Sequence, residues 1–361
     1  MADSLPPREQ NDVVIVPDDD PYAGDDPDFL TETDVASSTQ SLSSSVLNYK
    51  YENGRRYHAY REGEYLVPND DREQDRLDLV RDQLVTIMPT TDQLFCLQHH
   101  HVCRLALGGD LFRSPIDPSE ARILDLGTGT GIWAIEMGDQ YPNATVIGTD
   151  LSPIQPRWVA PNCFFEVSDY ESEWDFSKPF DFIHARCLGG AVKDFPRLIQ
   201  RAKDHLHTDG WLEFADFAGE VFSDDGGLER APYTMEIYKL VDEASVKFGK
   251  KQNAAPYYKQ WLIEAGFKNV KEEVYKLFVT KIPLNPWPKD PKLKEIGRYQ
   301  QVNMLEGLDA YTLALFTRIL GWSTEQVYAY NAEVRKELVD RSLHLYGKFV
   351  WVSGQRNDRL S

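Results

Sequence analysis

Glycine and acidic residues are concentrated in one short stretch of the chain, ILDLGTGTGIWAIEMGDQYPNATVIGTDLS, which runs from Ile123 to Ser152. The residues of its turn that could bind a ligand are Asp125, Gly127, Thr128, Gly129 and Gly131. The apolar run after them ends at Asp150 and Leu151. A glycine-rich turn between a strand and a helix, followed by a strand that ends on an acid, is typical of nucleotide-type cofactor sites, because the acid accepts hydrogen bonds from ribose hydroxyls. At this point NAD, FAD and S-adenosylmethionine are all candidates.

The spacing and charge of the turn discriminate among these cofactors. A dinucleotide fingerprint requires G-x-G-x-x-G, and counting from Gly127 places Ile132 where the third glycine belongs. A pyrophosphate would lie against the positive end of the following helix, where the carboxylate of Asp125 would repel it. The sulfonium and ammonium groups of S-adenosylmethionine instead suit a carboxylate. The turn therefore favours S-adenosylmethionine, with a cofactor-free domain whose glycines only tighten a turn as the alternative.

Strands and helices alternate around this turn, which is typical of a parallel α/β sheet. The predicted strands are Ile123–Leu126, Val146–Asp150, Phe164–Val167, Phe182–Ala185, Trp211–Phe214 and, later, the segments 269–279 and 345–355. One helix is predicted to begin near Asp71, a second covers 91–109 and stops at Gly108-Gly109, and a third lies in 191–210 and ends at a turn at Asp209-Gly210. Further helices are predicted at Met235–Phe248, in a stretch ending at Gly266, and at roughly 292–343. Asp169, with Tyr170 beside it, follows the third strand, where an acid can accept a hydrogen bond from the adenine amino group.

The composition limits the functions that this chain can have. Of its 361 residues 42% are hydrophobic, enough for a sizeable core, and the formal net charge of −19 disfavours binding to nucleic acid or anionic lipid. Four cysteines without a CxxC pair indicate reduced thiols, and we find neither a secretory signal nor a membrane-spanning run, so we expect a cytoplasmic or nuclear protein. The acidic, Ser-rich residues 1–45 are predicted to be a disordered tail, either for docking and modification or only for solubility.

Longer segments resemble a known family. The stretch 123–174, together with FDFIHAR (180–186), NPWPKDPKLKEIGRYQ (285–300) and FTRILGWSTEQV (316–327), is similar to class I methyltransferases and, more closely, to the fungal LaeA-like methyltransferases of secondary metabolism. The resemblance implies S-adenosyl-L-methionine as cofactor and a Rossmann-like, seven-stranded, mostly parallel sheet with an antiparallel last strand. The domain limits expected with it are a tail at 1–45, a helical lid segment at 46–118, a methyltransferase core at 119–282, a helical cap at 283–343, and the last strand and C-terminal tail at 344–361.

Candidate acceptor-side residues follow the fourth and fifth predicted strands. Methyl transfer from a sulfonium needs mainly alignment, and a base only if the acceptor must lose a proton, so we expect no universal catalytic signature. His184 is a candidate base, or a structural histidine bonded to a backbone carbonyl. Asp216 is a second candidate base, or an exposed surface carboxylate. Arg186 would contact the carboxylate of the cofactor, an acidic acceptor, or a structural ion-pair partner.

Other chemistry-bearing side chains have two interpretations each. In the lid, Tyr57 and Tyr60 are predicted to contact the cofactor, with simple core packing as the alternative. The run His99-His100-His101 predicts no metal site, because adjacent residues of a helix point in different directions and no carboxylate pair completes a ligand set. Cys187 is either a reactive thiol beside the acceptor or a buried structural cysteine.

The sequence thus predicts a methyltransferase that acts on a small natural product or on a protein. Resemblance to LaeA implies an alternative, a nuclear regulator that works mainly through velvet-type partner proteins with little acceptor turnover. A third hypothesis, from a different class, is a ligand-gated interaction module. A closed, aromatic-lined cavity would favour a small acceptor, and an open groove would favour a protein.

Overall fold

The fold is built on one central sheet. The computed structural model describes residues 15–18, 50–53, 55–57, 66–70, 98–156, 158–273 and 281–357. The order of the strands across the sheet is β5, β4, β3, β6, β7, β10 and β8, and β9 pairs with β10. The strands are β3 (Arg122–Leu126), β4 (Thr145–Asp150), β5 (Cys163–Val167), β6 (Phe180–Arg186), β7 (Leu206–Phe222), β8 (Lys268–Glu273), β9 (Lys281–Pro283) and β10 (Tyr346–Gln355).

The strand directions confirm the predicted fold class. β3 pairs in parallel with β4 and β6, β4 with β5, and β6 with β7. β10 runs antiparallel to both β7 and β8, so the sheet is mostly parallel with an antiparallel last strand. The short β9 adds an eighth strand beside β10, which the sequence pattern does not predict, so the sheet has eight strands and not seven.

Successive residues of β3 pack on opposite faces of the sheet. Ile123 belongs to the same apolar cluster as Trp133 of α3 (Ile132–Gln140). Leu124 instead shares a cluster with residues of α4 (Phe195–His205) and α6 (Tyr258–Glu264). Both side chains are fully buried. Because neighbouring side chains of a strand point to opposite faces, this burial requires helices on both sides of the sheet.

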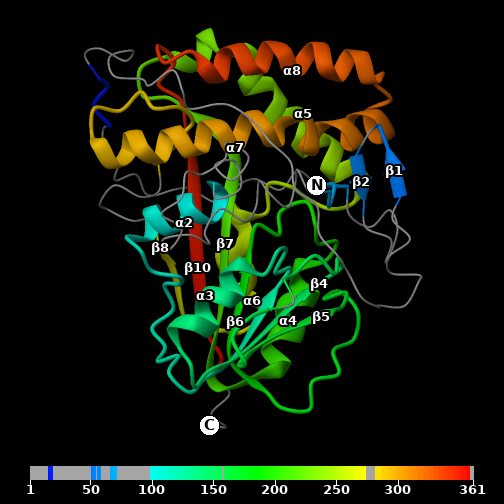
Figure 1. Ribbon diagram of the computed structural model, residues 1–361, viewed down its shortest axis with the longest axis vertical. Coiled ribbons are helices and arrows are strands. Elements are labelled where there is room, and N and C mark those ends of the chain that lie inside the picture. Colours follow the sequence, from blue (N-terminus) through cyan, green and yellow to red (C-terminus); the bar gives the residue numbers. More distant parts are fainter. Residues whose placement is uncertain are drawn as a thin grey trace.

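Three helices form a cap over one end of the sheet (Figure 1). They are α5 (Pro232–Phe248), α7 (Pro291–Leu315) and α8 (Thr324–Val339), and α7 continues into the π-helical turn η5 (Phe316–Leu320). All of them contribute to one apolar cluster. The boundary predicted between core and cap, at residue 283, therefore assigns α5 to the core, although α5 packs with the cap helices. No helix in the described ranges is both long and apolar enough to cross a membrane.

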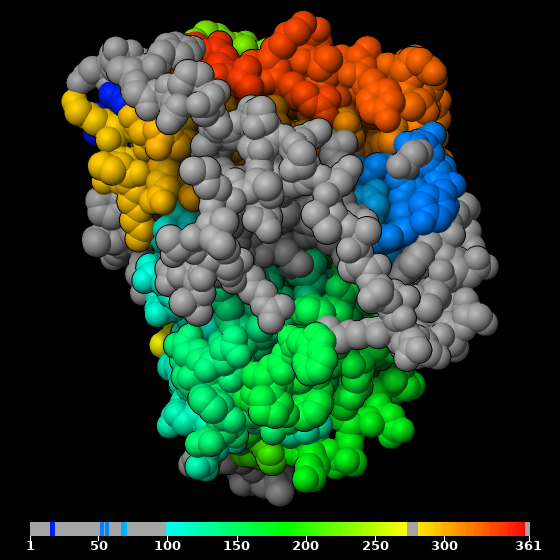
Figure 2. Space-filling view, viewed as in Figure 1, coloured from blue at the N-terminus to red at the C-terminus, as the bar shows by residue number. Residues whose placement is uncertain are grey.

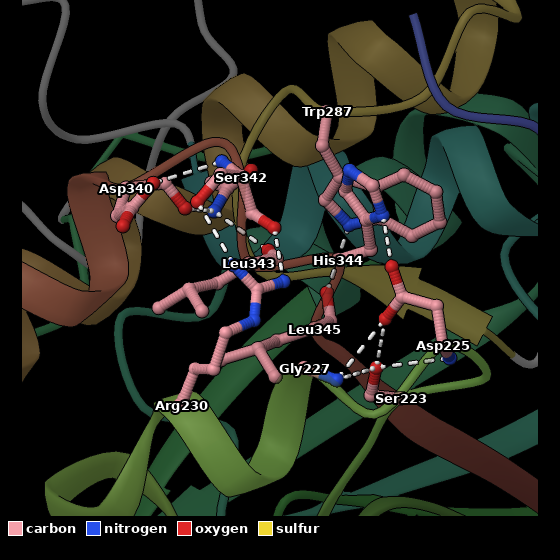
Figure 3. Close-up of polar contacts among 11 residues, drawn as sticks. Ser223, Asp225, Gly227, Arg230, Trp287, Asp340, Ser342, Leu343, His344 and Leu345 are labelled. Atoms are coloured by element: carbon pink, nitrogen blue, oxygen red, sulfur yellow. Dashed lines mark hydrogen bonds and ion pairs between the residues drawn. The ribbon is translucent and has the colours of Figure 1, made fainter.

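Polar contacts join the cap to the start of β10 (Figure 3). His344 Nδ1 lies 2.5 Å from a carboxylate oxygen of Asp225, and the ring of Trp287 lies against His344 with centroids 4.9 Å apart. The indole N–H of Trp287 donates to the carbonyl of Leu345 (3.0 Å). Arg230, just before α5, donates to the carbonyl of Ser342 (2.7 Å). These contacts fix the chain on both sides of the cap helices.

The described part of the N-terminal segment contains a short hairpin and a loop. The hairpin strands β1 (Lys50–Glu52) and β2 (Arg55–Tyr57) lie against the end of the cap (Figure 2), where Arg318 forms an ion pair with Glu52. Arg55 binds the carboxylate of Asp70 (2.5 Å) and so ties the loop 66–70 to the hairpin. The helix predicted near Asp71 lies outside the described residues. The helix predicted at 91–109 is described as α2 (Gln98–Leu107), which ends before Gly108-Gly109.

The fifth predicted strand is much longer than its local pattern indicates. β7 extends from Leu206 to Phe222, so the predicted turn at Asp209-Gly210 is wrong and these residues lie inside the strand. Asp209 keeps the left-handed backbone of a turn (φ 70°). Its N–H donates to the carbonyl of Arg356, and the N–H of Arg356 donates to the carbonyl of Gly210, both at 2.8 Å. Pairing with a segment distant in sequence therefore extends the strand.

Candidate cofactor and acceptor site

A cavity of about 310 Å³ lies between the carboxyl ends of the parallel strands and the cap. Residues at the ends of β3, β4 and β6 and in the second half of β7 line one side, and residues of α5 and α7 line the other. The strand order reverses at β3, between β4 and β6, and such switch points are where open α/β sheets bind ligands. The sequence-predicted residues that line the cavity are Asp125, Gly127, Thr128, Gly129, Asp150, Leu151, Tyr170, His184, Arg186 and Asp216.

The glycine turn has a backbone that glycine adopts without strain, with φ of 63° at Gly127 and 59° at Gly129. The N–H of Thr128 donates to the carbonyl of Thr149 (2.9 Å). The N–H of Gly129 donates to Oδ2 of Asp150 (2.8 Å). These two bonds tie the turn to the end of β4, so the turn and the candidate ribose acceptor form one unit.

We expect Gly131→Ala to lower the free energy of unfolding by about 1–3 kcal/mol. Gly131 precedes α3 with φ 86°, and an added Cβ would lie 2.4 Å from Cζ of Phe165, so the ring would have to move. Gly249→Ala is the matched control, because that glycine has φ 90° and nothing within 4 Å of an added Cβ. Urea unfolding measures both variants. Equal losses would show that Phe165 does not restrict the turn.

Asp150 is placed to accept hydrogen bonds inside the cavity. Besides the Gly129 N–H, its carboxylate accepts from the N–H of Ser152 (2.9 Å). Burial raises its pKa to about 6, against the lowering effect of these backbone hydrogen bonds. Carboxylate oxygens with remaining lone pairs are the acceptors that two neighbouring ribose hydroxyls need. Asn69 of the N-terminal loop donates to Oγ of Ser152 (3.1 Å), so part of the predicted lid reaches the same corner.

Asp125 and His184 form a buried pair across neighbouring strands. Nδ1 of His184 lies 2.8 Å from Oδ1 of Asp125, and the hydroxyl of Thr128 donates to Oδ2 (2.6 Å). The indole of Trp133 stacks on the imidazole, with ring centroids 3.8 Å apart and planes 4° apart. The partner of Nδ1 is thus a carboxylate and not the predicted backbone carbonyl. The ring is almost fully buried against Trp133, which favours a structural role. Asp125 still lines the cavity.

Asp216 is buried, so the alternative of an exposed surface carboxylate is wrong. Its Oδ2 accepts from the hydroxyl of Tyr258 and from the N–H of Gly189, and its Oδ1 from the N–H of Phe217, each at 2.8 Å. Burial raises its pKa to about 6, and these hydrogen bonds oppose the rise. A cavity carboxyl that ionises near neutral pH has the properties of a general base.

Asp169 lines a neighbouring hollow. Tyr170 and Leu151 line both this hollow and the main cavity. Its carboxylate accepts from the N–H of Glu171 and the hydroxyl of Ser172, both at 2.9 Å. The carboxylate therefore shapes the turn after β5. Its contact with the adenine amino group stays a prediction.

The described lid tyrosine packs with the cap. Tyr57 is buried in the cap cluster, with the Arg318 guanidinium 5.1 Å from its ring centre. Tyr57 is not among the described residues that line the cavity, so any effect of Tyr57→Ala on cofactor affinity would be indirect. Tyr60 lies outside the described residues.

The three consecutive histidines of α2 have three different partners. The contacts are His99 Nε2 to Cys187 Sγ at 2.9 Å, His100 Nδ1 to Arg186 Nη2 at 2.9 Å, and the His101 ring to the Tyr299 ring at 4.6 Å between centroids. In the described part of the chain, no group of three or more His, Cys, Asp or Glu residues is placed to hold a metal ion. Cys187 lines the cavity in a left-handed conformation (φ 57°) and is half-buried beside the imidazole of His99, and its reactivity stays a prediction.

The sequence predicts a helical cap at 283–343 but none of the cap residues that line the cavity. Ile237 and Val241 of α5, and Met304 and Leu308 of α7, line it with apolar surface. Each pair is four residues apart, which places its members on one face of a helix. The same spacing occurs in any packed helix, so the pattern alone cannot separate a ligand-facing stripe from a core-facing one.

The charges of the cavity fit S-adenosylmethionine better than a dinucleotide. The carboxylates of Asp125, Asp150 and Asp216 would repel a diphosphate and attract a sulfonium or an ammonium. The guanidinium of Arg186 supplies a cation for a carboxylate. The donors and acceptors are therefore distributed as a cofactor with both charges requires.

Known proteins are similar to this chain over most of its length. Residues 98–272 match the family model of a methyltransferase domain. Methyltransferase pytC of Aspergillus terreus is 42% identical over 324 residues, which cover 90% of this chain and 93% of that protein. Secondary metabolism regulator LAE1 of Cochliobolus heterostrophus is 36% identical, covering 84% and 93%. Protein-methionine methyltransferase laeA of Emericella nidulans is 31% identical, covering 86% and 77%.

Proposed function

Because the chain belongs to the methyltransferase family that includes pytC and the LaeA-type regulators, we propose that it methylates a small, mainly apolar acceptor of fungal secondary metabolism. S-adenosyl-L-methionine is its methyl donor. The observation that supports a small acceptor is the cap wall of the cavity, which α5 and α7 build largely from apolar and aromatic side chains.

The cap wall suits burial of an apolar molecule. Beyond its aliphatic residues it includes the rings of Tyr238, Phe248 and Tyr311. Gln300 and Asn303 of α7 add a few buried polar groups among them. An apolar cavity with a small number of polar groups binds small molecules by area burial, at about 25 cal/mol per Å², and orients them through the polar groups. A charged peptide would lose its hydration there without compensation.

The residues of this chain would align the acceptor and move a proton. Bound S-adenosylmethionine supplies an electrophilic methyl group. An acceptor hydroxyl must lose its proton as the new bond forms. Asp216, a buried carboxylate of the cavity, would take it, because Asp125, which also lines the cavity, is already paired with His184. With its pKa near 6, Asp216 is mostly ionised at neutral pH. Asp150 and the glycine turn would hold the ribose of the cofactor.

Transfer of an isotopically labelled methyl group tests this function. The full chain is incubated with labelled S-adenosylmethionine and an extract of fungal metabolites and proteins. We expect the label in small, organic-soluble compounds. Label confined to proteins would contradict the proposal, and so would the absence of transfer by a chain that binds the cofactor.

We expect Met304→Trp to lower methyl transfer to the small acceptor about tenfold or more and to leave the affinity for S-adenosylhomocysteine within about twofold. Met304 lines the cavity from the cap, and an indole there would fill acceptor space. Val246→Trp, on the exposed side of α5 with 52% exposure, is the control and should change neither quantity. Parallel rate and calorimetry measurements decide. Equal losses of transfer and cofactor affinity would show that the acceptor does not bind against the cap wall of the cavity.

The alternative is a regulatory role in the nucleus with velvet-type partners. It is supported by two relatives, one named as a regulator and one as a protein-methionine methyltransferase. Tight binding of S-adenosylhomocysteine without transfer to any small molecule would favour it. A nuclear location of a fluorescently tagged chain would agree with this alternative, and a cytoplasmic location with a biosynthetic enzyme.

A further inference from the structure

Arg186 is a cation of the cavity with no carboxylate partner among the described residues. It is the last residue of β6, is half-buried and lines the cavity. Its guanidinium donates to Nδ1 of His100 (2.9 Å). None of the ion pairs found in the described ranges includes it. The thiol of Cys103, whose pKa burial raises to about 11, also forms a hydrogen bond with this guanidinium. A guanidinium that is partly removed from water and whose partners, an imidazole and a thiol, are both neutral is suited to an anionic ligand.

His100 holds this guanidinium without cancelling its charge. The imidazole is fully buried, and its Nε2 lies 3.1 Å from Oε2 of Glu136. Burial, with a contribution from Arg186, lowers the pKa of His100 to about 4, so the ring is neutral at physiological pH. A neutral imidazole that donates from Nε2 to a carboxylate must accept at Nδ1. Glu136 therefore fixes the tautomer that orients Arg186.

The negative charge of Glu136 is kept away from the cavity. The same Oε2 atom accepts from the guanidinium of Arg104 (2.7 Å), which compensates the carboxylate. A carboxylate at position 100 would have formed an ion pair with Arg186 and neutralised it. With an imidazole between Glu136 and Arg186, the guanidinium is held by neutral groups and its charge remains available to a ligand.

We propose that Arg186, held by the positioning residue His100 and by Glu136 behind it, forms a carboxylate-binding site in the cavity. The planar guanidinium offers paired donors that match the two oxygens of a carboxylate. The carboxylate comes either from the amino-acid end of the cofactor or from an acidic acceptor. The site rests on the proposed function only for the second source, because the first requires cofactor binding alone.

Calorimetric titration of the full chain with two probes tests the site. S-adenosylhomocysteine carries the carboxylate, and 5′-methylthioadenosine lacks the whole amino-acid end. We expect Arg186→Met and His100→Phe to weaken S-adenosylhomocysteine about tenfold and to leave 5′-methylthioadenosine within about twofold. His101→Phe is the control, since that neighbour contacts Tyr299 and does not line the cavity among the described residues.

His100→Asn separates orientation from packing. The amide oxygen of asparagine lies near the position of Nδ1 and can accept from Arg186, so this variant should keep most of the affinity that His100→Phe loses. Thermal unfolding of each variant shows whether the chain stays folded. A loss in His100→Asn as large as that in His100→Phe would contradict the positioning role.

A second arm distinguishes the two sources of the carboxylate. If an acidic acceptor is the ligand, Arg186→Met at saturating cofactor should lose labelled transfer to acidic compounds and keep transfer to neutral ones. Either result supports the site. The proposal is overturned if Arg186→Met changes neither the affinity for S-adenosylhomocysteine nor the labelling of any acidic product. Failure to find any acceptor would contradict the proposed function, and the titration with S-adenosylhomocysteine would still test the carboxylate-binding site.

Discussion

Asp150→Ala is expected to weaken the binding of S-adenosylmethionine at least about 100-fold, because two hydrogen bonds from ribose hydroxyls to a carboxylate, about 1.5–3 kcal/mol each, are lost. The substitution also removes the acceptor of the Gly129 N–H, so the glycine turn loses its tie to β4. Calorimetric titration with S-adenosylhomocysteine measures the affinity without turnover.

Two further variants show whether the loss of affinity is specific to the carboxylate of Asp150. Asp139→Ala removes the same charge from an exposed site on α3 and should leave the affinity unchanged. Asp150→Asn keeps one acceptor oxygen and should fall between the native chain and the alanine variant. An Asp150→Ala affinity within about threefold of the native value would mean that the ribose binds elsewhere.

Asp216→Asn is expected to lower kcat for a hydroxyl acceptor by about 10²–10⁴-fold, the usual contribution of a positioned base. Burial raises the pKa of Asp216 to about 6. Because only the ionised carboxylate can take a proton, kcat of the native chain should rise as the pH increases through about 6 and be lost below it. Steady-state rates at saturating cofactor between pH 5 and 8 measure this rising limb of the pH profile of kcat.

Tyr258→Phe tests the assignment of the pH dependence to Asp216. The phenol hydroxyl donates to Asp216 Oδ2 (2.8 Å) and lowers the pKa of the carboxyl, so its removal should move the limb to higher pH. A limb that stays near 6 in Tyr258→Phe, or persists in Asp216→Asn, would assign it to another group. Unchanged S-adenosylhomocysteine affinity in both variants would separate proton transfer from cofactor binding.

The fold and the cofactor side of the cavity follow from local sequence patterns. Gly127 and Gly129 predict the turn, and the strands on either side of the turn and its helix are predicted by short apolar runs. Once these strands are parallel neighbours, topology alone brings Asp125 and Asp150 to the same sheet edge. Their placement could therefore be predicted before any contact was known.

The acceptor side depends on contacts between distant segments and could not be predicted in this way. Asp216 is buried because β7 continues to pair with β10 beyond the predicted strand end and because Tyr258 of α6 covers the carboxylate. His184 meets a carboxylate of the adjacent strand, a contact set by register. His100 gains its role from Arg186, which lies 86 residues further along the chain. No pattern within α2 contains that information.

Titration of the full chain with S-adenosylmethionine and, separately, with NAD is the most direct measurement of the central claim, that the carboxylates of the cavity select a cationic sulfur ligand. We expect saturable binding of S-adenosylmethionine and none of NAD. Saturable binding of NAD together with no heat from S-adenosylmethionine would contradict the account.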